Sequence, residues 1–95
     1  MNIIHIKTAN GHMNINTETF FPCTQKKFRK LLKVINEFSY MNNVQEISEQ
    51  IKQRLTYQIR VSEQYAAFAR YTASGARIER EIKMLKKNLE LLGQL

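Results

Sequence analysis

Two histidines and one cysteine are the side chains of this sequence that could bind a soft metal ion or act as a nucleophile: His5, His12 and Cys23. Their spacing matches no zinc-binding pattern, and a structural zinc site would need a fourth ligand that is not evident in the chain. A cysteine–histidine nucleophile pair would need an orienting aspartate and a glycine loop for an oxyanion, whereas the chain has no aspartate and only three glycines. Cys23 precedes a predicted helix, which could lower its pKa, but it is more simply interpreted as a small buried residue. We therefore expect no metal site and no cofactor.

The carboxylates do not suggest an acid–base pair either. All eight acidic residues are glutamates, and six lie in the C-terminal half: Glu46, Glu49, Glu63, Glu79, Glu81 and Glu90. Several have a basic residue three or four positions away, such as Glu49 with Lys52 and Glu79 with Lys83, which is typical of the surface of a helix. No glycine loop that could bind a phosphate is present. The sequence therefore predicts a protein that is not an enzyme.

The basic residues give the strongest functional signal. The net charge is +7 in 95 residues, which favours an anionic partner such as nucleic acid, a nucleoprotein, an acidic protein surface or a membrane surface. Ten basic residues form two clusters on predicted helices: Lys26, Lys27, Arg29, Lys30 and Lys33 in the first, and Arg77, Arg80, Lys83, Lys86 and Lys87 in the last. Such faces can contact successive phosphates, and the alternative is a merely solvated surface. No motif for reading a DNA sequence accompanies them.

A β-hairpin is expected over residues 1–21. Residues 3–8 and 13–18 alternate between apolar and polar side chains, and Asn10-Gly11 between them is typical of a type I′ turn. Pairing Ala9 with His12 would place Ile6 opposite Ile15 and Ile4 opposite Thr17. The apolar face of the hairpin is then Ile4, Ile6, Met13 and Ile15, and it must rest on a helix because an isolated hairpin is marginal in water.

A first helix is predicted over residues 24–40, with Thr24 as its N-cap and Phe20-Phe21-Pro22 closing the joint before it. At 100° per residue its apolar side chains share one side and its cations gather on the other. The apolar face is Phe28, Leu31, Leu32, Ile35 and Phe38. The polar residues 41–43 then form a connector.

The remaining half of the chain, residues 44–92, is helical by its pattern and contains one glycine, Gly75. Three groups of side chains can be separated within it: an aromatic edge of Tyr57, Val61, Tyr65, Phe68 and Tyr71, an alanine edge of Ala66, Ala69, Ala73 and Ala76, and a narrow seam of Ile78, Ile82, Leu85, Leu89 and Leu92. We interpret the aromatic edge as core rather than as a base-stacking platform. The seam is of coiled-coil type and is a candidate surface for a homodimer.

The pattern changes phase near Ser74-Gly75, and this predicts a break between a helix over residues 44–73 and another over residues 76–92. A tight turn there, with Gly75 as the residue after the helix, would give a helical hairpin. The alternative is one continuous helix of about 70 Å, whose seam would need a partner. The expected fold is α+β in a single domain, mostly helical, with an N-terminal β-hairpin, a basic helix and a long helical hairpin. No segment reaches the length needed to span a bilayer, and with a single cysteine we expect a cytoplasmic protein without a membrane partner.

The run Thr19 to Ile35, with the sequence TFFPCTQKKFRKLLKVI, and the Asn-Gly hairpin before it resemble the start of small accessory proteins carried on conjugative elements, plasmids and phages of Gram-positive bacteria. Some proteins of such elements are anti-CRISPR inhibitors, which act without catalysis by occupying a surface of a Cas effector. The resemblance implies a binding protein that acts on a nucleoprotein, and most concretely a Cas effector together with its guide RNA. A charge of +7 departs from the acidic DNA mimics among such inhibitors. The alternatives are a general DNA- or RNA-binding accessory protein and a coiled-coil oligomerisation module.

Overall fold

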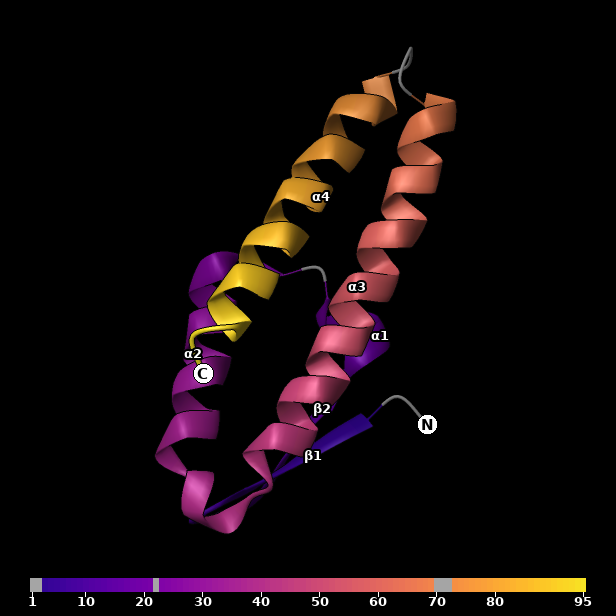
Figure 1. Ribbon diagram of the computed structural model, residues 1–95. Helices are drawn as coiled ribbons and strands as arrows, with labels where there is room; N and C mark the ends of the chain where they lie inside the picture. The colour runs from indigo at the N-terminus through magenta and orange to yellow at the C-terminus, as the bar shows by residue number, and fades with distance from the viewer. Residues whose placement is uncertain (1–2, 22, 70–72) are drawn as a thin grey trace.

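The computed structural model describes residues 3–21, 23–69 and 73–95. It has the expected α+β fold, in which a two-stranded antiparallel sheet is followed by helices (Figure 1). The elements in chain order are β1 (Ile3–Thr8), β2 (Gly11–Asn16), α1 (Thr17–Phe20), α2 (Gln25–Glu37), the 3₁₀ turn η1 (Ser39–Met41), α3 (Val44–Ala69) and α4 (Ala73–Leu92).

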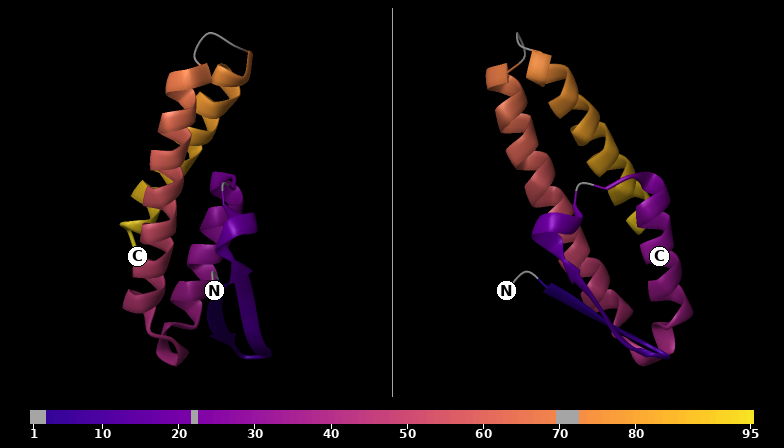
Figure 2. Two further views of the ribbon diagram at one scale, coloured as in Figure 1. Left: turned by 90° about the vertical axis from the view of Figure 1, so that its right-hand side faces the viewer. Right: turned by 180° about the vertical axis from the view of Figure 1, so that it is seen from behind.

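The two long helices α3 and α4 lie side by side and run in opposite directions (Figure 1). The β-hairpin, α1 and α2 pack against only one end of this pair, so that the other end projects beyond them (Figure 2). The molecule is accordingly elongated, with extents of 48 × 25 × 19 Å. Of the two arrangements that the sequence allowed, the helical hairpin is the one observed.

The predicted break at Ser74-Gly75 is wrong, because both residues already belong to α4. Helix α3 ends at Ala69, and residues 70–72 lie outside the described part of the chain. Gly75 is not a helix terminator but a buried residue of α4, and a residue without a side chain lets a neighbouring helix approach closely. The phase change in the sequence therefore correctly indicates that one helix ends and another begins, but the boundary lies before Gly75 and not at it.

The hairpin register differs from the predicted one by two residues. Thr8 pairs with Gly11, Ile6 with Met13 and Ile4 with Ile15. The predicted type I′ turn is also wrong. Such a turn needs positive φ at both of its central residues, whereas among the described residues φ is positive only at Gly11, at +127°. Since side chains alternate with a period of two, a shift of two residues leaves the same set on one face. The apolar face of the hairpin is therefore as predicted.

The second strand ends two residues earlier than expected, at Asn16. Asn16 caps the single-turn helix α1, with its side chain accepting a hydrogen bond from the Glu18 backbone N–H at 3.0 Å. Thr17 is consequently not a strand residue opposite Ile4 but the buried first residue of α1. Phe21 is extended and buried, as the prediction for the joint required, whereas Pro22 lies outside the described residues.

Helix α2 begins as predicted, because the Thr24 hydroxyl accepts a hydrogen bond from the Lys27 backbone N–H at 3.3 Å. It ends at Glu37 rather than Tyr40, and η1 follows it. Asn43 then caps α3 by accepting from the Glu46 N–H at 3.1 Å. The polar connector, residues 41–43, therefore both reverses the chain direction and supplies the N-cap of α3.

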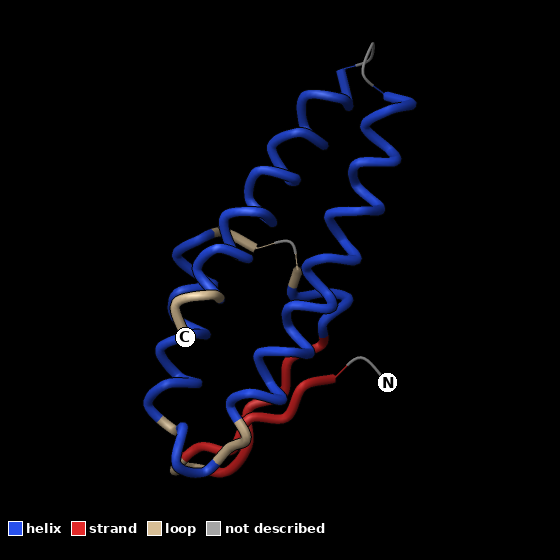
Figure 3. Tube along the Cα trace, in the orientation of Figure 1, coloured by secondary structure: helices blue, strands red, loops and turns tan. Residues whose placement is uncertain are grey.

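The hydrophobic core lies where the hairpin, α2, and the adjoining ends of α3 and α4 meet (Figure 3). Helix α3 contributes buried side chains from Ile47 to Leu55, with Ile59 packed against them, and α4 contributes buried side chains from Leu85 to Leu92. The buried apolar residues are Ile4, Ile6, Ile15, Phe21, Cys23, Phe28, Leu31, Ile35, Ile47, Ile51, Leu55, Leu85 and Leu92. None of the helices within the described residues is long and apolar enough to cross a bilayer.

Candidate functional site

The cationic face of α2 is the most distinctive surface of the molecule. Its side chains point away from Phe28, Leu31 and Ile35, which are buried against the hairpin and the long helices. This follows from the helical period, because four of the five basic residues occupy the arc opposite the apolar one, while Lys27 lies at its edge beside Phe20. The cationic face consists of Lys26, Lys27, Arg29, Lys30 and Lys33, and all five residues are exposed.

These cations have no carboxylate partner within the described part of the chain. The ion pair found there joins Arg77 Nε to Glu81 Oε1 on α4, at 3.8 Å. On α2, Lys27 makes a cation–π contact instead: its Nζ lies over the Phe20 ring, 4.9 Å from the ring centroid. The positive charge of α2 is therefore directed to solvent rather than neutralised within the fold.

The second predicted cluster, on α4, is also exposed but is spread along the helix. Arg77 and Arg80 lie in its first two turns, in the part of α4 that projects away from α2 (Figure 1). Lys83, Lys86 and Lys87 lie further along α4, where the helix approaches α2. The structure therefore places the last three on the part of α4 nearer to α2 and separates the two arginines from α2.

A buried asparagine joins α4 to the start of α2. Asn88 is fully buried, and its Nδ2 donates a hydrogen bond to the Cys23 carbonyl oxygen at 2.9 Å. Its Oδ1 is buried with no hydrogen-bond partner. Because the residue follows Lys86 and Lys87, this contact fixes their helix against the N-terminal end of α2. Sequence reasoning missed Asn88, and the polar residue inside the leucine seam was the available signal.

Cys23 is buried, as the simpler interpretation required. Burial raises the pKa of its thiol to about 11, although the charge of Lys27 acts in the opposite direction. Burial therefore outweighs the lowering of the pKa that was expected from the helix N-terminus, and Cys23 is a poor nucleophile near neutral pH.

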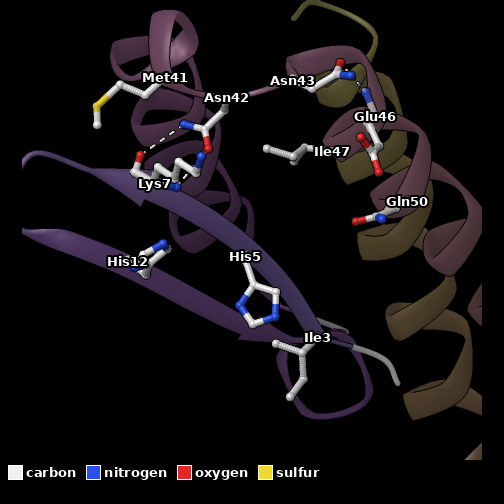
Figure 4. Close-up of a pocket in the computed structure, with 10 residues that line it drawn as sticks. All are labelled: Ile3, His5, Lys7, His12, Met41, Asn42, Asn43, Glu46, Ile47 and Gln50. Carbon is white, nitrogen blue, oxygen red and sulfur yellow. Dashed lines mark hydrogen bonds between the residues drawn. The ribbon is translucent and has the colours of Figure 1, made fainter.

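The histidines lie on the exposed face of the hairpin. His5 Nδ1 is 2.7 Å from Asn14 Oδ1, and both histidines line a pocket with the start of α3, as Figure 4 shows. Among the described residues no group of three His, Cys, Asp or Glu side chains is placed to hold a metal ion.

The same pocket contains a polar contact that sequence reasoning missed. The Asn42 side chain accepts from the Lys7 N–H at 2.8 Å and donates to the Lys7 carbonyl at 3.0 Å (Figure 4). It also donates to the Phe38 carbonyl at 2.8 Å. Asn42 thus pairs with the free edge of β1 as a neighbouring strand would, and it ties the hairpin to the connector between α2 and α3.

Two expectations about the long helices are wrong. The aromatic edge is not core, since Tyr57, Tyr65 and Phe68 are 54%, 64% and 89% exposed, and Tyr71 lies outside the described residues. The seam of α4 is not a free surface for a homodimer, because Leu85 and Leu92 are buried within the chain, Leu89 packs against the core, and Ile78 and Ile82 are half-buried. Both errors have one cause: α3 packs along α4 and covers its seam, while the hairpin and α2 cover only the first half of α3.

Comparison of the chain with protein-family models, with curated proteins and with solved structures found no significant match.

Proposed function

We propose that this protein binds nucleic acid presented in a nucleoprotein complex, and that the cationic face of α2 is its contact surface. One observation carries the proposal: five exposed cations lie within eight residues of one helix, without a carboxylate partner among the described residues. A solvated surface would gain little from this concentration of one sign of charge, because mixed charges serve solubility equally well. A surface that binds phosphates, in contrast, gains affinity from such a concentration of positive charge.

The spacing of the cations suits a polyanion. Lys26, Lys30 and Lys33 are four and three residues apart, so they lie in one row, with axial steps of about 6 Å and about 4.5 Å at the rise of an α-helix. Arg29 flanks the row on one side and Lys27 on the other. Such a row contacts phosphates without reading bases, so binding should be strongly dependent on salt and weakly dependent on sequence.

The nature of the target rests on the resemblance of residues 19–35 to small proteins of Gram-positive mobile elements. Some proteins of such elements are anti-CRISPR inhibitors, and the most concrete version of the proposal is inhibition of a Cas effector that carries its guide RNA. The chain would act by occupying a surface and not by chemistry. Its charge of +7 supports contact with exposed RNA or DNA and opposes mimicry of DNA.

The test compares two double variants of equal charge. Lys26→Gln/Lys30→Gln removes two cations from the α2 row, whereas Lys52→Gln/Arg60→Gln removes two exposed cations from α3. Binding to RNA and to double-stranded DNA is measured as a function of salt concentration. The α2 variant should lose affinity and reduce the slope of log K against log[salt] by about 1.4 to 1.8, from 0.7–0.9 for each phosphate contact, while the α3 variant should keep the slope of the wild type.

An unchanged slope in the α2 variant would refute the contact surface. The same titrations against a Cas effector with and without its guide RNA separate the versions of the proposal. Equal affinity for bare nucleic acid and for the nucleoprotein would identify a general DNA- or RNA-binding protein instead of an inhibitor of one complex.

A further inference from the structure

The second half of α3 carries exposed aromatic side chains that the fold leaves uncovered. They are Tyr57, Tyr65 and Phe68, and with the half-buried Val61 between them they are called here the aromatic stripe. The four residues are spaced by four, four and three residues and therefore share one face of the helix. Phe68 is 89% exposed, which is unusual for a residue without a polar atom. An exposed stripe of this kind marks a surface that another molecule covers.

The stripe continues a face of α3 that borders the hairpin lower down. One to two turns earlier, Gln50 and Arg54 line a pocket with Ile3, Ile4 and Thr17, and Tyr57 lines the same pocket. Beyond this point α3 and α4 project as a two-helix arm, comprising residues 57–69 and 73–81 (Figure 2). The hairpin and α1 stop where the stripe begins, so this face of α3 is open to another molecule along the arm.

The charge of the arm indicates what kind of molecule this is. Its two segments, residues 57–69 and 73–81, contain three arginines and three glutamates, so their net charge is zero, and the net +7 comes from the rest of the chain. A polyanion would be drawn to that remainder rather than to the stripe. Two copies of the chain would repel each other through their basic parts, but not through their arms.

From these observations we infer that two copies of this chain associate through their aromatic stripes, arm against arm. The stripe is self-complementary under a two-fold axis placed midway between Val61 and Tyr65. Two antiparallel copies of α3 then bring Val61 of one against Tyr65 of the other, and Tyr57 against Phe68, as an isologous interface requires. The two arms together form a four-helix bundle, with a basic part at each end.

The area available sets the strength of this association. An aromatic side chain buries about 150–250 Å² when it is fully covered, and six partly exposed rings therefore supply on the order of 800 Å² in total. This is below the roughly 1,200 Å² of a stable interface, so the dimer should form reversibly with a dissociation constant in the micromolar range, on the order of 10⁻⁶ to 10⁻⁴ M. Salt should strengthen it, because screening weakens the repulsion between the basic parts.

The test is sedimentation of the full chain from about 5 to about 500 μM, at low and high salt. The wild type should shift from the mass of one chain, 11.2 kDa, toward twice that mass, and more so at high salt. Phe68→Ser/Tyr65→Ser should weaken association by about tenfold or more. Tyr40→Ser should leave it unchanged, because Tyr40 is 78% exposed but lies in η1, at the opposite end of the molecule.

A wild type that stays monomeric over the whole range would overturn the inference, and so would a dimer that the stripe variant retains. Loss of RNA binding in the stripe variant of a monomeric wild type would assign the rings to base stacking instead. This test can fail without the proposed nucleic-acid binding failing, and the reverse. Binding of nucleic acid by the cationic face of α2 weakens as the salt concentration rises, whereas association through the stripes should strengthen.

Discussion

Replacing Asn88 by aspartate should make the stability of this protein depend on pH. The wild-type amide donates a hydrogen bond to the Cys23 carbonyl from a fully buried position, while its Oδ1 has no partner. In Asn88→Asp the shape is kept, but an ionised carboxylate can only accept hydrogen bonds, so it opposes the carbonyl and leaves a charge buried without a hydrogen bond. Such a charge costs about 3–5 kcal/mol. Lys27, whose charge acts on Cys23, offsets part of this cost, so we expect a loss of about 3 kcal/mol at pH 7.

Acid should restore most of the loss. Burial raises the pKa of the introduced carboxyl in the folded state above its unfolded value of about 3.9, so the folded state binds the proton more tightly. The penalty is therefore smallest below about pH 4 and grows as the pH rises through the folded-state pKa. The protonated acid can also donate to the Cys23 carbonyl, which should leave a deficit of about 1 kcal/mol or less.

Urea unfolding followed by circular dichroism at pH 4 and pH 7, referred to the wild type at each pH, measures this effect. Asn36→Asp is the control, since it makes the same chemical change at an exposed position of α2 and should alter stability by less than about 0.5 kcal/mol at either pH. If Asn88→Asp unfolds at pH 7, recovery of helical structure on acidification still reports the effect. A variant as stable as the wild type at both pH values would mean that Asn88 is hydrated and does not hold α4 against the start of α2.

Four further predictions concern the joints of the fold. Gly11→Ala should cost more than about 1 kcal/mol in a thermal melt, because φ is +127° there while nothing lies within 4 Å of an added Cβ, so that the cost is strain and not a clash. Thr24→Ala should lower the free energy of unfolding by about 1 kcal/mol through loss of the N-cap of α2. Asn42→Ala removes three hydrogen bonds and should cost about 2 kcal/mol in urea unfolding, with faster hydrogen exchange in β1. Cys23 should react slowly with a thiol reagent at pH 8 and rapidly in urea, because its pKa of about 11 belongs to the folded state; rapid reaction of the native protein would contradict its burial.

Features that depend on the local chain could be predicted from the sequence. Thr24 caps α2 as expected, because a cap involves a side chain and a backbone N–H three residues apart. The buried face of α2 follows from the helical period of 3.6 residues, and the apolar face of the hairpin follows from the strand period of 2. The hairpin face was predicted correctly even though the predicted pairing of the two strands was wrong. The exposure of the cationic face of α2 follows from the same periodicity.

Features that join distant segments could not be predicted in this way. Asn42 meets Lys7 across 35 positions of the chain, and Asn88 meets Cys23 across 65. An asparagine has the same local preferences whether it is exposed or pairs with a buried carbonyl, so only the packing of α4 and the connector reveals these contacts.

The sequence by itself determined which segments are helices and strands and which sides of them are apolar, because those properties repeat along the chain. Only the tertiary structure decided how far each apolar side is covered. Leu85 of the seam is only 1% exposed, while Phe68 of the aromatic stripe is 89% exposed. The physical reason is one of length: the hairpin and α2 are shorter than α3, and a short partner can cover only part of a long helix.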